Sequence, residues 1–328
     1  MSNSAAVAQT QKEMRKRNRA HNSWGKALRQ HGWLYVMLIP GVVWMLIFCY
    51  LPMGGLVMAF ENFSPYAGST IVDCLIKSEK VGFLNFQRLF TGTDFINLLR
   101  NTLAISFANL LIAFPAPIIL ALMLNELRCM WFKRLSQTFV YIPHFISLVI
   151  VATLTFQLFN ATDGGVYSLM KEFMGPNAPN ILADPKYFVT LIVGQNLWKE
   201  TGYGTIIYLA ALAGVDPQLY EAAKIDGAGR WNLMWNVTLP AIRGTIVIML
   251  IMKVGALLNT GYEQIFLMQN AMNRSVAEVF DTYVYTKGVS QGQYSLATTA
   301  GLFKSIVSLI MVLSANKISK MLGESGLY

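Results

Sequence analysis

Residues 215–242 read VDPQLYEAAKIDGAGRWNLMWNVTLPAI, and this polar stretch decides how the rest of the chain is interpreted. Asp216 is a favourable N-cap and Pro217 suits the first position of a helix, so a helix is predicted to begin there. Gly227 and Gly229 then let the backbone turn sharply. The first half of the stretch therefore predicts a capped helix followed by a glycine turn.

The second half of the stretch leads into an apolar segment. A short helix is predicted from Trp231 to Val237, ending before Pro240, because the residue that precedes a proline is disfavoured in helical conformation. Most connections between secondary-structure elements contain only a few residues. A helix, a turn and a second helix are therefore interpreted as a functional module rather than as a connector.

Apolar segments flank this module and recur along the chain. Of the 328 residues, 54% are hydrophobic and 13% are charged, whereas soluble domains have about 45–50% apolar and about 25% charged residues. Six segments are long enough to cross about 30 Å of hydrocarbon as helices. An all-α integral membrane protein with six transmembrane helices is predicted, with residues 215–242 as a cytoplasmic loop. The predicted spans are 33–60, 95–124, 135–160, 186–212, 241–260 and 296–316.

Basic residues orient the six predicted spans. Residues 1–30 contain seven Lys and Arg but only one acidic residue, Glu13. Because cytoplasmic segments beside a span carry an excess of Lys and Arg, residues 1–32 are predicted to be a cytoplasmic tail that contacts membrane lipid. Six spans then place both termini in the cytoplasm, and residues 33–328 form the transmembrane domain. This tail accounts for most of the net charge of +9, so nucleic acid is not expected as a partner.

Several classes of protein are excluded by what the chain lacks. It has no GxxxxGK[ST] phosphate loop and no HExxH sequence. Its three cysteines form no CxxC pair, so neither a disulfide framework nor a zinc site is indicated. Residues 288–292 match GxSxG, but no strand is predicted before them and all three histidines precede Ser290, so the match is ascribed to chance. A non-catalytic chain without a bound metal or cofactor is predicted.

The polar stretch also carries a known pattern. Glu221-Ala222-Ala223 is followed after three residues by Gly227, and after nine more by Val237-Thr238-Leu239-Pro240. This spacing resembles the EAA loop of binding-protein-dependent ABC importer permeases, with Val237 in place of isoleucine. Further stretches resemble the branch of that family that imports complex oligosaccharides. They are residues 198–231, 281–288, 292–303 and the ending GESGLY at 323–328.

The resemblance implies a type I ABC importer fold in a bacterial inner membrane. In this family the loop forms a coupling helix that docks on a separate ATPase. The implied partners are two ABC ATPase subunits that hold ATP and Mg²⁺, a second homologous permease that is usually a different chain, and an extracytoplasmic solute-binding protein. The residues that the resemblance assigns to ATPase coupling are Glu221, Ala222, Ala223, Asp226, Gly227, Leu239 and Pro240.

Polar residues within the predicted spans are candidate substrate contacts, because polar groups are costly in lipid. Amide and charged groups suit sugar hydroxyls, and aromatic faces suit sugar rings. Two lysines, Lys199 and Lys253, favour an acidic oligosaccharide such as one that contains uronate, while a neutral one stays open. The candidate path residues are Gln195, Asn196, Trp198, Lys199, Tyr203, Lys253, Asn259, Tyr262 and Gln264.

Structural alternatives compete with these assignments. Lys199 and Lys253 could each pair with an acid on another helix, Trp198 could serve in packing or as a gate, and Asn109 and Lys304 are interpreted as interhelical. Residues 276–285 are predicted to form an interfacial helix facing the solute-binding protein.

Two other functions stay open. One is an ion-coupled secondary transporter that uses Lys199 and Glu200 as relays, and the other is a membrane scaffold whose loop binds a partner other than an ATPase. Copurification of a P-loop ATPase would distinguish an ABC permease from both.

Overall fold

The computed structural model describes residues 24–324 and 326–327. The chain divides into two compact units, and the boundary along the sequence lies between Val57 and Met58. The predicted cytoplasmic tail lies outside the described residues as far as residue 23.

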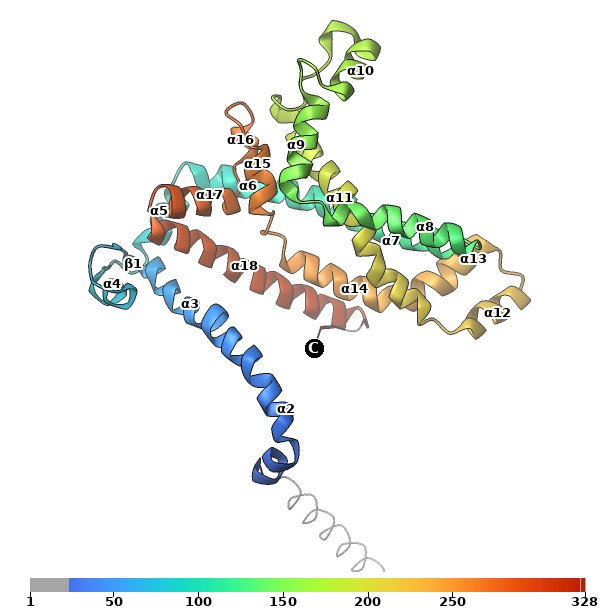
Figure 1. Ribbon diagram of the computed structural model, residues 1–328, viewed down its shortest axis with the longest axis horizontal. Helices are drawn as coiled ribbons and strands as arrows, with labels where there is room; N and C mark the ends of the chain where they lie inside the picture. The colour runs from blue at the N-terminus through green and yellow to red at the C-terminus, as the bar shows by residue number, and fades with distance from the viewer. Residues whose placement is uncertain (1–23, 325, 328) are drawn as a thin grey trace, which may run out of the picture. The chain divides into compact units, whose positions relative to one another are not determined.

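One helix makes up the described part of the first unit (Figure 1). It runs through α2 (Trp24–Met45), the π turn η1 (Leu46–Tyr50) and α3 (Leu51–Met53), and the 3-10 helix η2 (Gly54–Phe60) crosses the unit boundary. Its stretch Gly32–Phe60 has 29 residues and is long and apolar enough to cross a membrane. Its large apolar side chains are exposed, which suits a helix that lipid solvates.

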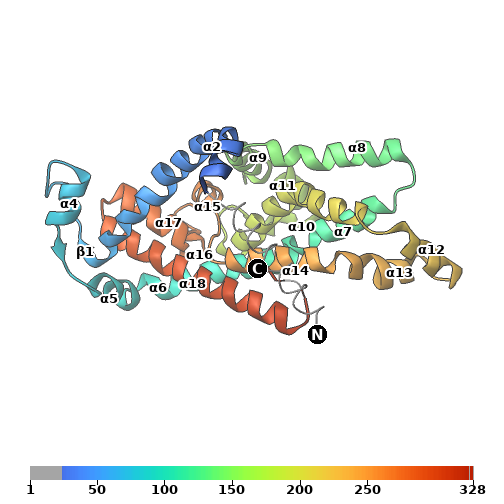
Figure 2. The same ribbon diagram turned by 90° about the horizontal axis from the view of Figure 1, so that it is seen from below.

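The second unit is mostly helical (Figures 1 and 2). Its two strands, β1 (Glu61–Asn62) and β2 (Glu79–Lys80), pair antiparallel. Its helices are α4 (Ile71–Lys77), α5 (Leu84–Thr91), α6 (Asp94–Ala108), η3 (Asn109–Ala113), α7 (Pro115–Asn125), α8 (Met130–Tyr141), η4 (Ile142–Phe145), α9 (Leu148–Phe159), α10 (Gly165–Met174), η5 (Gly175–Asn177), α11 (Pro185–Ala213), α12 (Pro217–Ile225), α13 (Arg230–Leu233), η6 (Met234–Thr238), α14 (Leu239–Gly255), α15 (Tyr262–Met268), α16 (Arg274–Ala277), α17 (Phe280–Tyr285), η7 (Thr286–Ser290) and α18 (Tyr294–Met321).

Each predicted span corresponds to a long helical stretch or to a bent pair of helices. Within residues 24–324, four stretches are long and apolar enough to cross a membrane, and one bent pair could form a fifth span. The remaining predicted span is α11, whose 29 residues extend over about 43 Å but include Lys199 and Glu200. The four unbent stretches are Gly32–Phe60, Asp94–Asn125, Arg230–Gly255 and Tyr294–Met321.

The predicted span at 135–160 corresponds to a bent pair of helices rather than to one straight helix. The helical pair Met130–Phe145 and Leu148–Phe159 is bent by 96°. Pro143 lies in the short 3-10 helix η4, and Ser147 caps a new helix by accepting a hydrogen bond from the backbone N–H of Ile150 at 3.3 Å. A proline followed by an N-cap therefore converts one apolar segment into two helices of different direction.

The prediction of a helix that ends before Pro240 is wrong. The helix that begins at Arg230 continues without a break to Gly255. The π turn Met234–Thr238 precedes Pro240, so the proline enters the first turn of α14 where it is tolerated. The span ends before residue 260, and Gly261, with φ of +87°, provides the turn into α15.

The predicted interfacial helix at 276–285 is instead two short helices, α16 and α17, separated at Glu278–Val279. Val279 and Phe280 are fully buried. Phe280 packs on Leu98, Tyr283 and Ala300, so this segment belongs to the core of the second unit.

α11 lies at the centre of the second unit. It packs along α7 and also contacts α6, α8 and α14. Its residues Phe188 and Ile192 enter a core with Ile265 and Met268, and its Tyr208 enters another with α7 and α14. The polar helix is thereby shielded by its neighbours.

Small residues set two of the helix crossings. A Cβ atom at Gly202 of α11 would overlap the backbone carbonyl of Val140 in α8, and a Cβ atom at Gly255 of α14 would overlap the side chain of Val312 in α18. Such close approaches are common where helices cross in membranes.

We expect Gly202→Ala to lower the stability of the protein, because the added methyl group meets backbone rather than a movable side chain. Overpacking of this kind costs about 1–3 kcal/mol. Gly194→Ala is the matched control on the same helix, since nothing lies within 4 Å of its added atom. Thermal unfolding in detergent measures both variants, and equal melting temperatures would contradict this view of the α8–α11 crossing.

Candidate functional site: an exposed loop and a polar cavity

The first half of the polar stretch folds as predicted. The Asp216 side chain accepts a hydrogen bond from the backbone N–H of Gln218 at 2.9 Å, and Pro217 opens α12. At the other end the N–H of Ala228 donates to the carbonyl of Ala223 at 2.9 Å. Gly227 between them has φ of +80°, a conformation that residues with a side chain rarely adopt.

The loop is exposed and presents both acidic and apolar side chains. Glu221, Ala222, Asp226 and Gly227 are exposed, and Ala223 is half-buried. Within the described part of the chain, no basic side chain forms an ion pair with Glu221 or Asp226. The apolar side chains exposed on α12 and after it are Leu219, Ile225 (86%), Trp231 (74%) and Trp235. This combination suits contact with another protein.

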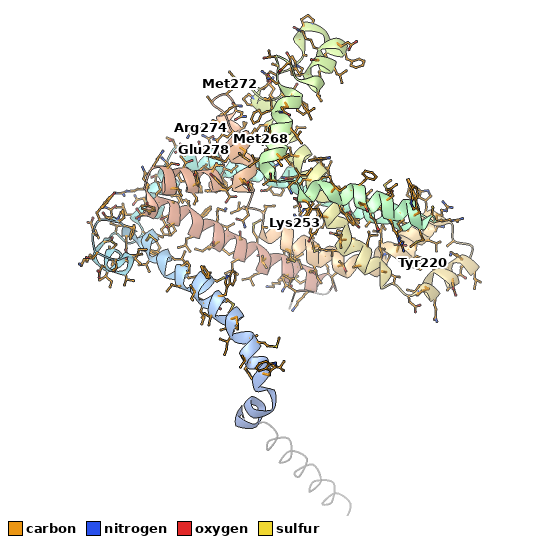
Figure 3. All side chains as sticks on the ribbon, in the orientation of Figure 1. Tyr220, Lys253, Met268, Met272, Arg274 and Glu278 are labelled. Carbon is orange, nitrogen blue, oxygen red and sulfur yellow. The ribbon has the colours of Figure 1, made fainter. Side chains whose placement is uncertain are left out.

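A hydrogen bond joins α12 to the long helix that follows. The hydroxyl of Tyr220 donates to Thr238 Oγ1 at 3.2 Å, and Thr238 in turn donates to the carbonyl of Leu233 at 3.2 Å. Thr238 is buried at the end of the π turn. Leu239 and Pro240 then begin α14, so the motif residues lie at both ends of this junction (Tyr220 is labelled in Figure 3). Sequence analysis missed Tyr220, which directly precedes the motif.

A polar cavity of about 430 Å³ lies farther along the same helix. Its walls come from α6, η3, α7, α11, α14 and the segment after α14. Four of the nine candidate path residues line it: Asn196, Tyr203, Lys253 and Asn259. The other polar residues of the lining are Ser106, Asn109, Glu200, Thr201, Tyr208 and Thr260.

Asn109 connects two walls of this cavity. Asn196 of α11 donates through Nδ2 to Asn109 Oδ1 at 3.1 Å, which confirms that Asn109 bonds between helices. Asn109 begins the π turn η3 and donates through Nδ2 to the carbonyl of Ile105 at 3.1 Å. π turns inside α-helices are frequent at functional sites, because the extra residue re-aims side chains.

Lys253 is the unpaired cation of the cavity. Its side chain is exposed, and no acidic group among the described residues forms an ion pair with it. Glu200, the acidic residue of the cavity wall, is already shared by His144 at 2.9 Å and Lys199 at 3.4 Å. In Figure 3, Lys253 lies between the loop end, marked by Tyr220, and the end marked by Met268. The cavity wall therefore carries the cation of Lys253 and the paired carboxylate of Glu200 beside amides and hydroxyls.

Lys199 contacts the bend between α8 and α9 rather than the polar cavity. Its buried ammonium group donates to the backbone carbonyl of His144 in η4 and lies 3.4 Å from Glu200, and it does not line the polar cavity. The ring of His144 stacks on Tyr203 with centroids 3.8 Å apart. Lys199 thus ties α11 to the bend between α8 and α9 through a backbone carbonyl, and its acidic partner Glu200 is its neighbour on α11 rather than an acid on another helix. His144 was missed because its partners are 55 to 59 residues away in the chain.

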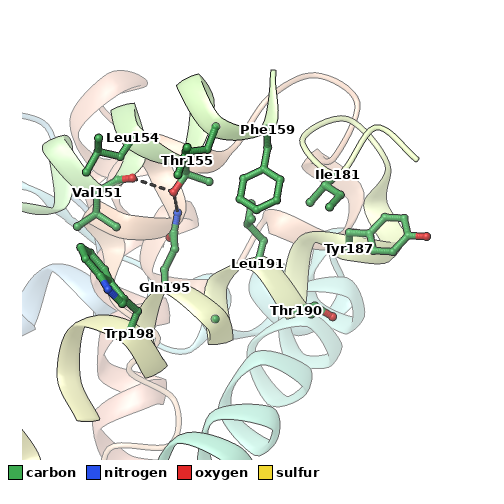
Figure 4. A pocket seen from close by; sticks show the side chains of 12 residues that line it. Val151, Leu154, Thr155, Phe159, Ile181, Tyr187, Thr190, Leu191, Gln195 and Trp198 are labelled. Carbon is green, nitrogen blue, oxygen red and sulfur yellow. Dashed lines mark hydrogen bonds between the residues drawn. The ribbon is translucent and has the colours of Figure 1, made fainter. Parts of the chain in front are cut away.

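The other candidate path residues also lie away from the polar cavity. Gln264 donates to Gln195 at 2.9 Å, and Gln195 donates to Thr155 at 2.7 Å, so these buried amides join α9, α11 and α15. Gln195 and Trp198 border a separate apolar cavity of about 540 Å³ between α9 and α11 (Figure 4). Tyr262 packs against Tyr285, with ring centroids 4.5 Å apart.

No group of three or more His, Cys, Asp or Glu side chains within residues 24–324 and 326–327 could hold a metal ion.

The long apolar helices, the exposed loop and the polar cavity together define a membrane permease of the ABC importer class. The chain matches the family described as binding-protein-dependent transport system inner membrane component over residues 113–323. It belongs to this family, and it is a multi-pass protein of the inner membrane. The resemblance based on the EAA loop is confirmed.

Relatives of known name cover nearly the whole chain. Protein LplB of Bacillus subtilis (strain 168) is 51% identical over 93% of this chain and 94% of its own length. The polygalacturonan/rhamnogalacturonan transport system permease protein YteP of the same organism is 50% identical over 92% of each chain. A chain in the crystal structure of a bacterial alginate ABC transporter, in complex with an alginate pentasaccharide-bound periplasmic protein, has a TM-score of 0.83 at 38% identity. That match covers 93% of this chain and 99% of the other.

Lys199→Met is expected to destabilise the protein. It leaves the carbonyl of His144 without its donor and removes one of the two partners of Glu200. Loss of a buried hydrogen bond to a charged group costs about 1.5–3 kcal/mol. Lys253→Met is the matched control, since Lys253 has no such partner among the described residues. A melting temperature that falls for both variants equally, or for neither, would contradict the structural role of Lys199.

Proposed function

We propose that this chain is the permease subunit of an ATP-driven importer of acidic, uronate-containing oligosaccharides. The observation that carries the substrate class is Lys253, which lines the polar cavity and forms no ion pair among the described residues, whereas the Glu200 carboxylate of the same wall is paired with Lys199 and His144. Two relatives support it, since the name of YteP refers to polygalacturonan and rhamnogalacturonan, and the solved transporter to alginate. All of these are acidic polysaccharides or contain acidic sugars.

Several polar groups of the cavity have counterparts in such a substrate. Asn196 and Asn259 offer amide donors and acceptors to sugar hydroxyls, and the ring of Tyr203 offers a face to a sugar ring. Lys253 offers a cation to a carboxylate, and hydrogen bonds to charged groups are stronger than those between neutral groups. The cavity forms one side of the path, and a second homologous permease, expected to be a different chain, supplies the other.

The loop is the part of this chain that contacts the ATPase. Glu221, Ala222, Ala223, Asp226 and Gly227 dock on an ABC ATPase subunit, and Leu239 and Pro240 pass its movement into α14. ATP and Mg²⁺ bind to two such ATPase subunits, while this chain binds no cofactor and catalyses no reaction. Exposed apolar side chains around unpaired carboxylates support this assignment.

The membrane orientation follows from the same assignment. The loop and both termini face the cytoplasm, and the end that carries α15 to α17 receives the substrate from an extracytoplasmic solute-binding protein. The excess of basic residues in the first 30 positions supports this orientation.

An ion-coupled secondary transporter is the second candidate function. It would need Lys199 and Glu200 as relays, but these side chains bond to each other and to His144 at the α8–α9 bend. That arrangement favours a structural tie. Uptake that requires ATP and a copurifying P-loop ATPase supports the importer, whereas uptake on an ion gradient by the chain alone supports the alternative.

Lys253→Met is expected to reduce uptake of an acidic oligosaccharide about 10- to 100-fold, the equivalent of one lost charge-assisted hydrogen bond. Uptake of a neutral oligosaccharide of the same length, where detectable, should change much less. Lys253→Arg keeps the charge and is the matched control. The measurement is initial uptake into proteoliposomes that contain the whole complex, and equal uptake of the acidic sugar by wild type and Lys253→Met would contradict the substrate assignment.

Gly227→Pro is expected to abolish uptake while the protein still inserts in the membrane, because proline holds φ near −65° and Gly227 requires +80°. Glu221→Lys should have the same effect by reversing a charge on the docking surface. Gly229→Ala is the control, since Gly229 has φ of −73° and open space for a methyl group. Uptake and ATP hydrolysis are measured together, and unchanged uptake in Gly227→Pro and Glu221→Lys would refute the coupling role of the loop.

A further inference from the structure

The end of the chain folds back on α18. Gly323, with φ of +80°, turns the backbone, and the N–H of Glu324 donates to the carbonyl of Ser319 at 3.1 Å. The N–H of Leu327 donates to Oδ1 of the buried Asn316 at 2.7 Å. A Cβ atom at Gly326 would meet Asn316 and Lys320, so the backbone lies directly on the helix. The described residues of the ending GESGLY, which are 323, 324, 326 and 327, therefore have a defined position on α18.

The seat brings Glu324 to the loop end of α14. Its Oε1 lies 2.7 Å from Nε of Arg243, and its side chain is 17% exposed compared with 61% for Arg243. Arg243 follows the motif residues Leu239 and Pro240 within the same unbroken helix, Arg230–Gly255. Its cation pairs with an acid 81 residues away rather than with the acids of the loop.

The pairing fits the register of the two helices, which run side by side in Figures 1 and 2. α14 and α18 touch at Gly255 and Val312. Arg243 precedes Gly255 by twelve residues of α14, about 18 Å, and α18 continues for nine residues beyond Val312, about 14 Å, as expected for an antiparallel pair. The turn at Gly323 then brings Glu324 back to Arg243. The ion pair therefore joins α14 to α18 at the end of the helix pair that lies near the loop.

The opposite end of the pair is closed by a second contact. Lys304 of α18 forms an ion pair with Asp281 of α17. Asp281 Oδ2 accepts hydrogen bonds from the backbone N–H of Thr260 at 2.9 Å and from its hydroxyl at 3.2 Å. Thr260 follows α14, so contacts join α14 to α18 on both sides of the Gly255–Val312 contact.

We infer that the Arg243–Glu324 ion pair makes α14 and α18 move together when the loop is displaced, and that both are positioning residues for coupling ATP hydrolysis to transport. The inference rests on the proposed function. The hydrogen bond between Tyr220 and Thr238 transmits a displacement of α12 to the helix that contains Arg243. The ion pair between Arg243 and Glu324 then transmits it to α18. A partly exposed ion pair contributes little to stability, so its loss should leave the fold intact.

The test uses the whole complex in proteoliposomes with its binding protein and an acidic oligosaccharide, and it measures sugar imported per ATP hydrolysed. Arg243→Gln and Glu324→Gln are each expected to lower this ratio about 3- to 5-fold, the size expected for one partly exposed pair. The charge-swapped double variant, Arg243→Glu with Glu324→Arg, should restore the ratio to within about 2-fold of wild type. Arg134→Gln is the control, because it removes an exposed positive charge of α8 that forms no ion pair among the described residues.

Wild-type ratios in both single variants, or a swapped variant as poor as the single ones, would overturn the inference. Melting temperatures close to that of wild type show that a lowered ratio reflects coupling rather than unfolding. Failure of the proposed function has a different signature, since the wild-type complex itself would then import no acidic oligosaccharide. If one single variant fails to accumulate, the other and the swapped variant still decide the outcome.

Discussion

The unbroken helix from Arg230 to Gly255 is the constraint on which the rest of the structure depends. It begins beside the exposed loop, contains the junction with Tyr220 at Thr238, and reaches the polar cavity at Lys253. Thr238 and Lys253 are fifteen residues apart, about 22 Å along a helix. Backbone hydrogen bonds make such a helix stiff, so the loop and the cavity cannot shift independently at short range. The π turn at Met234–Thr238 is what lets Pro240 enter this helix without breaking it.

α11 organises the remaining walls by presenting different chemistry on neighbouring faces. Asn196 and Tyr203 face the polar cavity, while Gln195 and Trp198 face the apolar one. Lys199 lies between these faces and is satisfied by the carbonyl at the α8–α9 bend. A buried ammonium group without such partners would be costly, so the bend and the lysine belong together. The polar side chains of this helix thus serve three purposes: packing, anchoring the bend and lining the polar cavity.

Features that depend on neighbours in the chain were predictable. The N-cap at Asp216, the turn at Gly227 and the positions of the apolar spans follow from local rules, and they agree with the structure. The EAA pattern identified the family because its spacing is fixed. The break near Pro143 and the continuity through Pro240 were not predictable, since a proline in a membrane helix either bends it or is absorbed by a π turn, and tertiary packing selects between these outcomes.

The partners of polar residues were the least predictable part of the site. Lys199 and Lys253 look alike in sequence, yet one bonds to a backbone carbonyl 55 residues away and the other faces a cavity. Arg243 lies close in sequence to the acids of the loop, whereas the acid that it pairs with is Glu324, 81 residues away. Spacing predicts contacts along one helix, but it carries no information on which carbonyl or carboxylate another helix will bring close.

The contact between Gly255 and Val312 gives the helix pair the geometry of a lever. Arg243 lies about 18 Å from this contact along α14, and Lys304 lies eight residues, about 12 Å, from it along α18. For a rigid rotation about that fulcrum, a displacement at the loop end reaches Lys304 reduced by about one third and reversed in direction. In the proposed importer, a push at the loop end would therefore become a smaller movement in the opposite direction at the end that carries Lys304.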